Sequence, residues 1–367
     1  MKISCIIHSL NGGGAERVMA GLASRLSHRG HDVTLITLDD GRKDKHEVDP
    51  RVKRVPLDVM GYSRSKLAAL INNVRRCRSL RAAVLDSHAD VVLSFCDVTN
   101  VLTLLAMRGL ATPVLVSERS DPKQQSLLWP WSSLRPRLYR NAAEVIVLTR
   151  AAAKTVMPWS HRSPVIIPSA VDPPLALDRS HLMGRSQHVV IGIGRLEIEK
   201  GFDRLIAAFA EVASQYPQWQ LRIVGEGSCR CQLEQQAAGL DLTNRIQFMG
   251  WIQPIWAALQ DADLFALTSR YEGFPSALLE AMAAGVAVLA VDCESGPREI
   301  IRHDVDGILA ANDDEALAAA LARCMGDASL RLRLGNQATS VSSRFSWQRM
   351  TDAYEQCLRA CADRAGT

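Results

Sequence analysis

Short apolar segments alternate with helical patterns along most of this chain, and this alternation restricts its fold more than any other feature. It begins with an apolar segment at 2–7, a glycine loop at 11–14, a helical pattern at 15–28 and a second apolar segment at 32–38. Further apolar segments follow at 91–95, 114–117 and 145–148. Because parallel strands need a crossover connection, usually a helix, the first half is predicted to form a parallel α/β sheet.

A second alternation begins at residue 188, after a polar passage with several prolines at 163–186. Its strands are expected at 189–193, 220–224, 245–249, 264–267 and 286–291. Its helices are expected to begin at Phe202, Ser228, Pro254, Pro275 and Pro297. This pattern is typical of another doubly wound α/β unit.

We therefore expect two Rossmann-like domains, because a chain of 367 residues is longer than one hydrophobic core usually serves. The N-terminal domain is predicted to span 1–170 and the C-terminal domain 171–345. The pattern stays helical from Asp313 through Cys361, and a C-terminal helix at 346–367 is predicted to pack back on the N-terminal domain. Ligands of open α/β sheets bind at the carboxyl ends of the strands, so the expected site is a cleft between the domains.

The composition is that of an ordinary soluble protein, with 47% hydrophobic and 22% charged residues. The chain has no run of about 18 or more uncharged apolar residues, so a membrane-spanning helix is not expected. Its apolar N-terminus lacks a cleavage site and is predicted to be a first strand rather than a signal peptide. The nine cysteines are odd in number and dispersed, which favours a reduced compartment, and a cytoplasmic location is predicted.

The two halves of the chain differ in charge. Residues 1–170 carry 25 Lys and Arg against 14 Asp and Glu, whereas the remainder carries 18 against 25. Basic residues and tryptophans gather at two places in the first half: Arg75, Arg76, Arg78 and Arg81, then Trp129, Trp131, Arg135, Arg137 and Arg140. Tryptophan beside arginine is typical of a protein on an anionic bilayer, which predicts peripheral contact with the cytoplasmic face of the inner membrane. A solvated helix face is the alternative.

The segment at 269–285 is the most informative for chemistry. Pro275 suits the first turn of a helix and Gly285 its end. The residues between them are mostly apolar, so this helix should be buried, and Glu280 is the exception. A buried carboxylate needs hydrogen-bond donors, which either a ribose diol or a structural arginine would supply. Glu272 precedes the helix, and Gly273 lets the backbone approach a ligand closely.

Glu272 and Glu280 have the E-x7-E spacing, and this segment resembles glycosyltransferase family 4, a family of retaining enzymes. Further matches lie at 11–17, 194–201, 225–227 and 292–300. The segment at 117–122 looks like a signature of members that build lipid-linked glycans and surface polysaccharides. The resemblance covers nearly the whole chain and implies an α/β fold of the GT-B type, with two doubly wound Rossmann-like domains that face a cleft.

The resemblance also implies roles for the matching residues. Arg195 and Lys200 would hold the donor diphosphate and neutralise the leaving group, while Glu272 would lie near the transferred sugar; these are the predicted catalytic residues. Two fixed positive charges suit this task when no metal is present. Glu280 would bind the donor ribose. The other predicted donor-binding residues are Gly13, Gly14, Gly194, Glu226, Gly273, Phe274, Pro275 and Ser276.

On the N-terminal side, the predicted acceptor-side residues are His8, Glu118 and Arg119, each at the end of an expected strand. Many family members place a histidine on this side, and a structural role for His8 is the alternative. No cofactor and no metal site are expected. Asp261 and Asp263 come closest to a metal-binding spacing, but they precede a strand and so lie away from the expected site.

The sequence thus predicts a retaining transferase that moves a hexose or N-acetylhexosamine from a nucleotide sugar, of the UDP type, to a lipid-linked, lipopolysaccharide or exopolysaccharide acceptor. A sugar-nucleotide epimerase or a phosphorylase is the rival, because the fold alone does not determine the reaction. The motif glutamates are not expected to act as the carboxylate pair of a glycosidase. A nucleic-acid-binding protein is the rival from another class, but the acidic second half disfavours a nucleic-acid partner.

Overall fold

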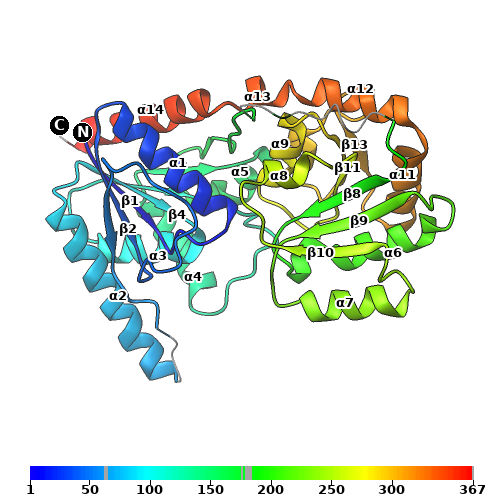
Figure 1. Cartoon of the computed structure of the whole chain (residues 1–367). Helices are drawn as coiled ribbons and strands as arrows, with labels where there is room; N and C mark the ends of the chain where they lie inside the picture. The colour runs from blue at the N-terminus through cyan, green and yellow to red at the C-terminus, as the bar shows by residue number, and fades with distance from the viewer. Residues whose placement is uncertain (62–64, 175–176, 178–183, 366–367) are drawn as a thin grey trace. The chain divides into compact units, whose positions relative to one another are not determined.

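The computed structural model describes residues 1–61, 65–174, 177 and 184–365, and the chain divides into two compact units (Figure 1). Unit 1 comprises Met1–Ser169 together with Gln348–Thr367, and unit 2 comprises Ala170–Trp347. Each unit contains one parallel sheet with helices around it. The predicted α/β class with two doubly wound sheets is therefore confirmed.

Unit 1 contains a seven-stranded sheet with the order β3-β2-β1-β4-β5-β6-β7. Its strands are β1 (Lys2–Ile7), β2 (Asp32–Thr37), β3 (Lys53–Pro56), β4 (Val91–Phe95), β5 (Val114–Ser117), β6 (Glu144–Val147) and β7 (Val165–Ile166). Its helices are α1 (Gly14–His28), α2 (Lys66–Asp86), α3 (Asp97–Ala106), α4 (Trp131–Leu138), α5 (Arg150–Val156) and nearly all of α14 (Trp347–Ala365), with 3-10 turns at Tyr139–Asn141 and Met157–Trp159. The strand order changes direction between β1 and β4, as in doubly wound folds.

Unit 2 contains a six-stranded sheet with the order β10-β9-β8-β11-β12-β13. Its strands are β8 (His188–Ile193), β9 (Trp219–Val224), β10 (Ile246–Gly250), β11 (Leu264–Leu267), β12 (Ala287–Val291) and β13 (Ile308–Ala310). Its helices are α6 (Phe202–Ala213), α7 (Arg230–Gly239), α8 (Trp256–Leu259), α9 (Ser276–Ala283), α10 (Pro297–Ile300), α11 (Asp314–Gly326), α12 (Ala328–Ala338) and α13 (Val341–Arg344), with a 3-10 turn, η4 (Ile198–Lys200).

Several inner strands are buried along their whole length because helices cover both faces of each sheet. Every residue of β4, β11 and β12 is buried, and so is all of β1 except Lys2. Strands of this kind consist of continuous apolar residues, which is why apolar runs in the sequence locate them. The observed bounds of β1, β4, β5 and β11 coincide with the predicted ones.

The sequence analysis missed three strands, and all of them lie at sheet edges. They are β3, β7 and β13, with four, two and three residues. An edge strand pairs on one side only, and such short segments do not show a periodic pattern. Their absence from the prediction therefore has a physical cause.

Helix α14 packs on unit 1 through Tyr354, which is fully buried. The Tyr354 hydroxyl lies 3.0 Å from Ser117 Oγ and accepts a hydrogen bond from Arg119 at 3.3 Å. Glu355 on the same helix receives hydrogen bonds from Arg29 at 2.7 Å and from His31 at 3.0 Å. These contacts attach α14 to the carboxyl end of β5 and to the C-terminal end of α1.

The longest helices that the structure describes are α2 and α14, with 21 and 19 residues. Both carry charged side chains at intervals along their length. Among the helices in the described ranges, none combines the length and the apolar character that crossing a bilayer requires.

The loop after β9 approaches the loop after β8 so closely that a side chain would not fit. Gly225 has a φ of +141°, and a Cβ atom there would lie 1.8 Å from the Gly194 carbonyl oxygen. The Gly194 N–H in turn donates to the Val224 carbonyl at 3.0 Å. This contact holds two strand ends of unit 2 together.

We expect Gly225→Ala to lower the unfolding free energy of unit 2 by at least about 2 kcal/mol, because both the backbone conformation and the contact with Gly194 would be lost. Urea unfolding followed by far-UV circular dichroism measures this. The matched control is Gly239→Ala at the end of α7, where a Cβ meets no atom within 4 Å. Equal stability of the two variants would contradict the predicted close contact.

Candidate active site

The predicted catalytic and donor residues of unit 2 lie at one edge of its sheet. Gly194 and Arg195 follow β8, Glu226 follows β9 and Glu272 follows β11. The strands are parallel, so their carboxyl ends meet at the same edge, where ligands of open α/β sheets bind. The positive end of a helix dipole after such a strand favours an anionic ligand there.

Arg195 lies in the turn between β8 and η4, and its side chain is 61% exposed. Its Nη2 atom donates to Glu199 Oε1 at 2.8 Å. This contact uses one nitrogen of a guanidinium that carries five N–H donors. The arrangement orients Arg195 and leaves it accessible to a ligand.

Lys200 and Glu272 form an ion pair at the centre of this edge. Lys200 Nζ lies 2.7 Å from Glu272 Oε1, and Ser269 Oγ donates to the same oxygen at 2.7 Å. Glu272 is only 7% exposed. A carboxylate taken out of water needs such donors, so the pair places a fixed positive charge beside a buried negative one.

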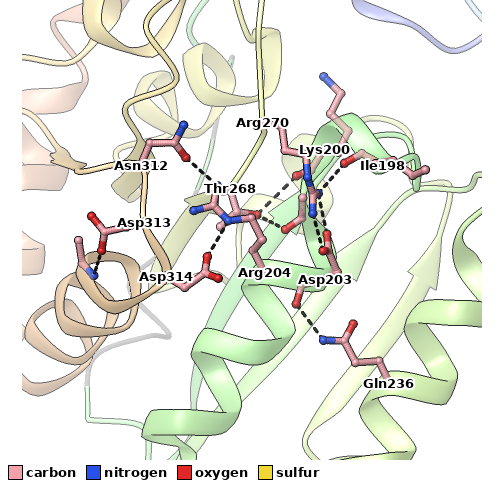
Figure 2. A network of polar contacts seen from close by, with 12 residues as sticks. Ile198, Lys200, Asp203, Arg204, Gln236, Thr268, Arg270, Asn312, Asp313 and Asp314 are labelled. Atoms are coloured by element: carbon pink, nitrogen blue, oxygen red, sulfur yellow. Dashed lines mark hydrogen bonds and ion pairs between the residues drawn. The ribbon is translucent and has the colours of Figure 1, made fainter.

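Arg270 ties the chain after β11 to the chain after β8 (Figure 2). Its guanidinium makes two hydrogen bonds with the Asp203 carboxylate, at 2.8 and 2.6 Å, and a third with the Ile198 carbonyl at 2.7 Å. The backbone N–H of Arg270 donates to the Glu199 carbonyl at 2.8 Å. The hydrogen bonds from Arg270 lower the pKa of Asp203. We call this set of contacts the Arg270 clamp.

The Arg270 clamp positions the Lys200–Glu272 ion pair without belonging to it. Lys200 lies between Glu199 and Asp203, which Arg270 contacts, and Glu272 lies two residues after Arg270. A second contact strengthens the junction, because Thr268 Oγ1 donates to the Gly201 carbonyl at 2.8 Å. Gly201 has a φ of +63°, and a Cβ there would lie 2.1 Å from the Thr268 carbonyl oxygen. Sequence reasoning missed this clamp because no pattern relates residues 67 positions apart.

Helix α9 begins beside this ion pair. Pro275 is its N-cap residue and Ser276 its first residue, preceded by Gly273 and Phe274. The Phe274 ring is buried and packs edge-on against Phe345, with ring centroids 5.2 Å apart. Backbone amides at a helix N-terminus without a side-chain cap remain available to oxygen atoms of a ligand.

Glu280 is buried on α9, as the apolar pattern around it predicted. Its neighbours Leu279 and Ala281 are fully buried. A carboxylate in this environment is costly unless donors meet it. The helix therefore holds an acidic group in place within about two turns of the Glu272 loop.

Glu226 differs from the other predicted donor residues because its side chain is largely exposed. It forms an ion pair with Arg230 of α7 at 2.5 Å. The same loop is held by Glu197, whose carboxylate accepts from the Ser228 N–H at 2.9 Å and from Ser228 Oγ at 2.6 Å. These hydrogen bonds lower the pKa of Glu197. Glu197 and Ser228 were not among the predicted site residues.

The predicted residues of the first glycine loop lie at the carboxyl edge of the sheet of unit 1. Gly13 is the N-cap of α1, and Gly14 is its first residue. His8 follows β1, and its Nε2 atom lies 3.2 Å from Glu16 Oε1. A Cβ on Gly13 would lie 2.2 Å from Glu16 Oε2, so this carboxylate packs directly over the glycine. Burial raises the pKa of Glu16, but the hydrogen bond and charge of His8 outweigh it and the pKa is lowered.

Glu118 and Arg119 follow β5, but their side chains are held inside unit 1. Glu118 is buried and accepts a hydrogen bond from Tyr139, and Arg135 Nε lies 3.3 Å from its Oε1. Burial raises the pKa of Glu118. Arg119 donates to Tyr354 at 3.3 Å and to Ser169 Oγ at 2.8 Å. This geometry gives both residues a structural task within the unit.

The part of the chain that the structure describes contains no group of three or more His, Cys, Asp or Glu side chains arranged to hold a metal ion. Asp263 belongs to the pair whose spacing came closest to that of a metal site, but its carboxylate has other partners. It forms an ion pair with Arg185, and its Oδ2 accepts from the Val189 N–H at 2.7 Å. It therefore fastens the start of β8.

Two family models match the chain, one on each unit. The glycosyl transferase 4-like domain matches residues 13–166, and the glycosyl transferases group 1 domain matches residues 177–341. Together they account for most of the chain. The resemblance to glycosyltransferase family 4 is thereby confirmed.

Similar proteins agree with this assignment. The GalNAc-alpha-(1->4)-GalNAc-alpha-(1->3)-diNAcBac-PP-undecaprenol alpha-1,4-N-acetyl-D-galactosaminyltransferase of Campylobacter jejuni is 29% identical over 343 residues, covering 92% of this chain and 92% of that protein. The structure of sucrose-phosphate synthase from Thermosynechococcus elongatus has a TM-score of 0.83 and 22% identity, and the match covers 98% of each chain. HepE of Anabaena in complex with UDP and glucose has a TM-score of 0.81 and 22% identity, covering 98% of this chain and 99% of that one. At these identities the structural likeness shows the fold, which is GT-B.

The domain matches follow one another in the order of the chain, and the full-length structural likeness joins them in a single GT-B architecture. The protein is therefore a glycosyltransferase, and it belongs to the family in which a glycosyl transferase 4-like domain is followed by a glycosyl transferases group 1 domain.

Proposed function

We propose that the protein transfers a hexose or N-acetylhexosamine, with retention of anomeric configuration, from a UDP-sugar to a lipid-linked or polysaccharide acceptor. The observation that carries this proposal is the Lys200–Glu272 ion pair at 2.7 Å, held at the carboxyl edge of a parallel sheet beside the exposed Arg195. The positive charges of Lys200 and Arg195 suit a diphosphate leaving group.

The donor is assigned to unit 2. Arg195 and Lys200 would bind the diphosphate, and the amides from Gly273 to Ser276 would face hydroxyl groups of the sugar. Glu280 would accept hydrogen bonds from the ribose diol, which is the role that the family resemblance implies for this carboxylate. We propose UDP as the nucleotide because the structural neighbour HepE was solved in complex with UDP and glucose.

The reaction requires stabilisation of charge on the leaving group. The bond between the anomeric carbon and the phosphate oxygen breaks, and a bond from that carbon to the acceptor oxygen forms on the same face. The acceptor proton passes to the leaving phosphate, so the products are UDP and the glycoside. Negative charge grows on the diphosphate during this step, where Arg195 and Lys200 stabilise it more than in the ground state.

The names of two relatives support the proposed acceptor class. The Campylobacter enzyme is named for an undecaprenol-diphosphate-linked glycan, and a relative in Erwinia amylovora is named for amylovoran biosynthesis. A lipid-linked acceptor would be met at a membrane surface, and the excess of basic residues in 1–170 suits anionic headgroups. His8 is the proposed acceptor-side group, because the Glu16 carboxylate orients its ring at the carboxyl edge of unit 1.

We expect Arg195→Ala and Lys200→Ala to lower kcat by ~10-fold to 1,000-fold, because their charges act mainly on the leaving group. Glu280→Ala should instead weaken binding of UDP, since the ribose contact exists before the reaction. Steady-state kinetics and calorimetric titration with UDP separate the two effects. Lys154→Ala, an exposed site on α5, is the control and should keep wild-type kinetics. Wild-type turnover in the Arg195 and Lys200 variants would refute these roles.

We expect activity to survive EDTA, because the leaving group is stabilised by protein cations rather than by a divalent ion. The measurement compares UDP release from a UDP-sugar before and after chelation, with added manganese as the third arm. Complete loss of activity in EDTA that manganese restores would mean that a metal ion carries the leaving-group charge.

A further inference from the structure

Four large aliphatic side chains stand exposed in a row on helix α2. Leu67, Leu70, Ile71 and Val74 are between 45% and 68% exposed. Their spacing of three, four and seven residues from the first places them on one face of the helix. We call these four residues the α2 stripe.

The α2 stripe is not covered by the unit that carries it. The buried residues of α2 are Leu80 and Val84, both in its C-terminal half, which packs on the core of unit 1. The N-terminal end of the helix extends beyond the rest of its unit (Figure 1). An apolar row of this kind on a protruding helix marks an interaction surface, since water solvates it poorly.

The charges around the α2 stripe indicate what covers it. Between Lys66 and Leu85 the sequence contains five basic residues and no acidic one. Arg75 and Arg78 are exposed beside the stripe, and no ion-pair partner for either appears among the described residues. An amphipathic helix with aliphatic residues on one face and arginines beside them is typical of a segment that lies in an anionic lipid interface.

Other basic residues of the predicted clusters serve the fold instead. Arg76 donates to the Val59 carbonyl at 3.0 Å, and Arg81 donates to the Ala106 carbonyl at 2.9 Å. In the second cluster, Trp131 packs against the core of unit 1 and Arg135 is buried against Glu118. Of the nine residues predicted to face a membrane, these four thus make contacts within unit 1.

We propose that the α2 stripe inserts into the interface of an anionic phospholipid layer, with Lys66, Arg75 and Arg78 against the headgroups. This inference rests on the proposed lipid-linked acceptor, because it gives the enzyme a way to stay at the surface where that acceptor lies. A second copy of the chain is the less suitable occupant, since pairing two such helices brings basic side chains together without acidic partners.

The test is cosedimentation of the full chain with vesicles of phosphatidylglycerol and phosphatidylethanolamine, against vesicles of phosphatidylcholine alone. Leu70→Gln with Ile71→Gln should lower partitioning by about 10-fold or more at every salt concentration, because apolar burial is not screened. Arg75→Gln with Arg78→Gln should lower it by about 5-fold per arginine at low salt only. Leu240→Gln with Leu332→Gln, at exposed leucines of unit 2, is the matched control and should bind as wild type.

Circular dichroism and UDP-sugar hydrolysis without vesicles should be unchanged in all three variants, which separates this proposal from the proposed function. Wild-type vesicle binding by the Leu70 and Ile71 variant, or no binding by the wild type, would overturn the insertion of α2. So would a dimer in sedimentation equilibrium that the same variant dissociates. If hydrolysis is absent while vesicle binding behaves as expected, the proposed function fails and the membrane surface stands.

Discussion

The chemistry proposed for this protein depends on the Lys200–Glu272 ion pair. Removing two charges from water costs more than their attraction returns unless further hydrogen bonds complete the arrangement. Here Ser269 supplies one such bond to Glu272, at 2.7 Å. A lysine held in this way is already ordered before a diphosphate binds. The loss of side-chain entropy therefore occurs during folding and does not weaken binding.

The fold brings the members of this ion pair together from distant parts of the chain. Lys200 follows β8 and Glu272 follows β11, two strands that are neighbours in the sheet. Arg270 then fixes the distance between their segments through the Asp203 carboxylate and two backbone carbonyls. Gly201 and Gly225 allow the neighbouring loops to approach within contact distance. Sheet order, close packing and the Arg270 clamp therefore all determine where the ion pair lies.

The sequence predicted the buried parallel strands and the residues near the ion pair, but not how those residues are held. Apolar runs identify β4 and β11 because both faces of these strands are covered, whereas the two-residue β7 carries no pattern. Family resemblance identified Lys200 and Glu272. It did not reveal Arg270, whose partner Asp203 is remote in sequence, or that Glu118 points into the core of unit 1 towards Tyr139. Side-chain direction and long-range pairing depend on tertiary packing, which periodicity does not encode.

The most direct test of this account is a crystal structure of the protein with UDP bound. The account predicts the diphosphate within hydrogen-bond distance of Arg195 and Lys200, and the ribose hydroxyls on the Glu280 carboxylate. It would be contradicted by UDP bound away from the carboxyl edge of the unit 2 sheet, or by a diphosphate that touches neither Arg195 nor Lys200.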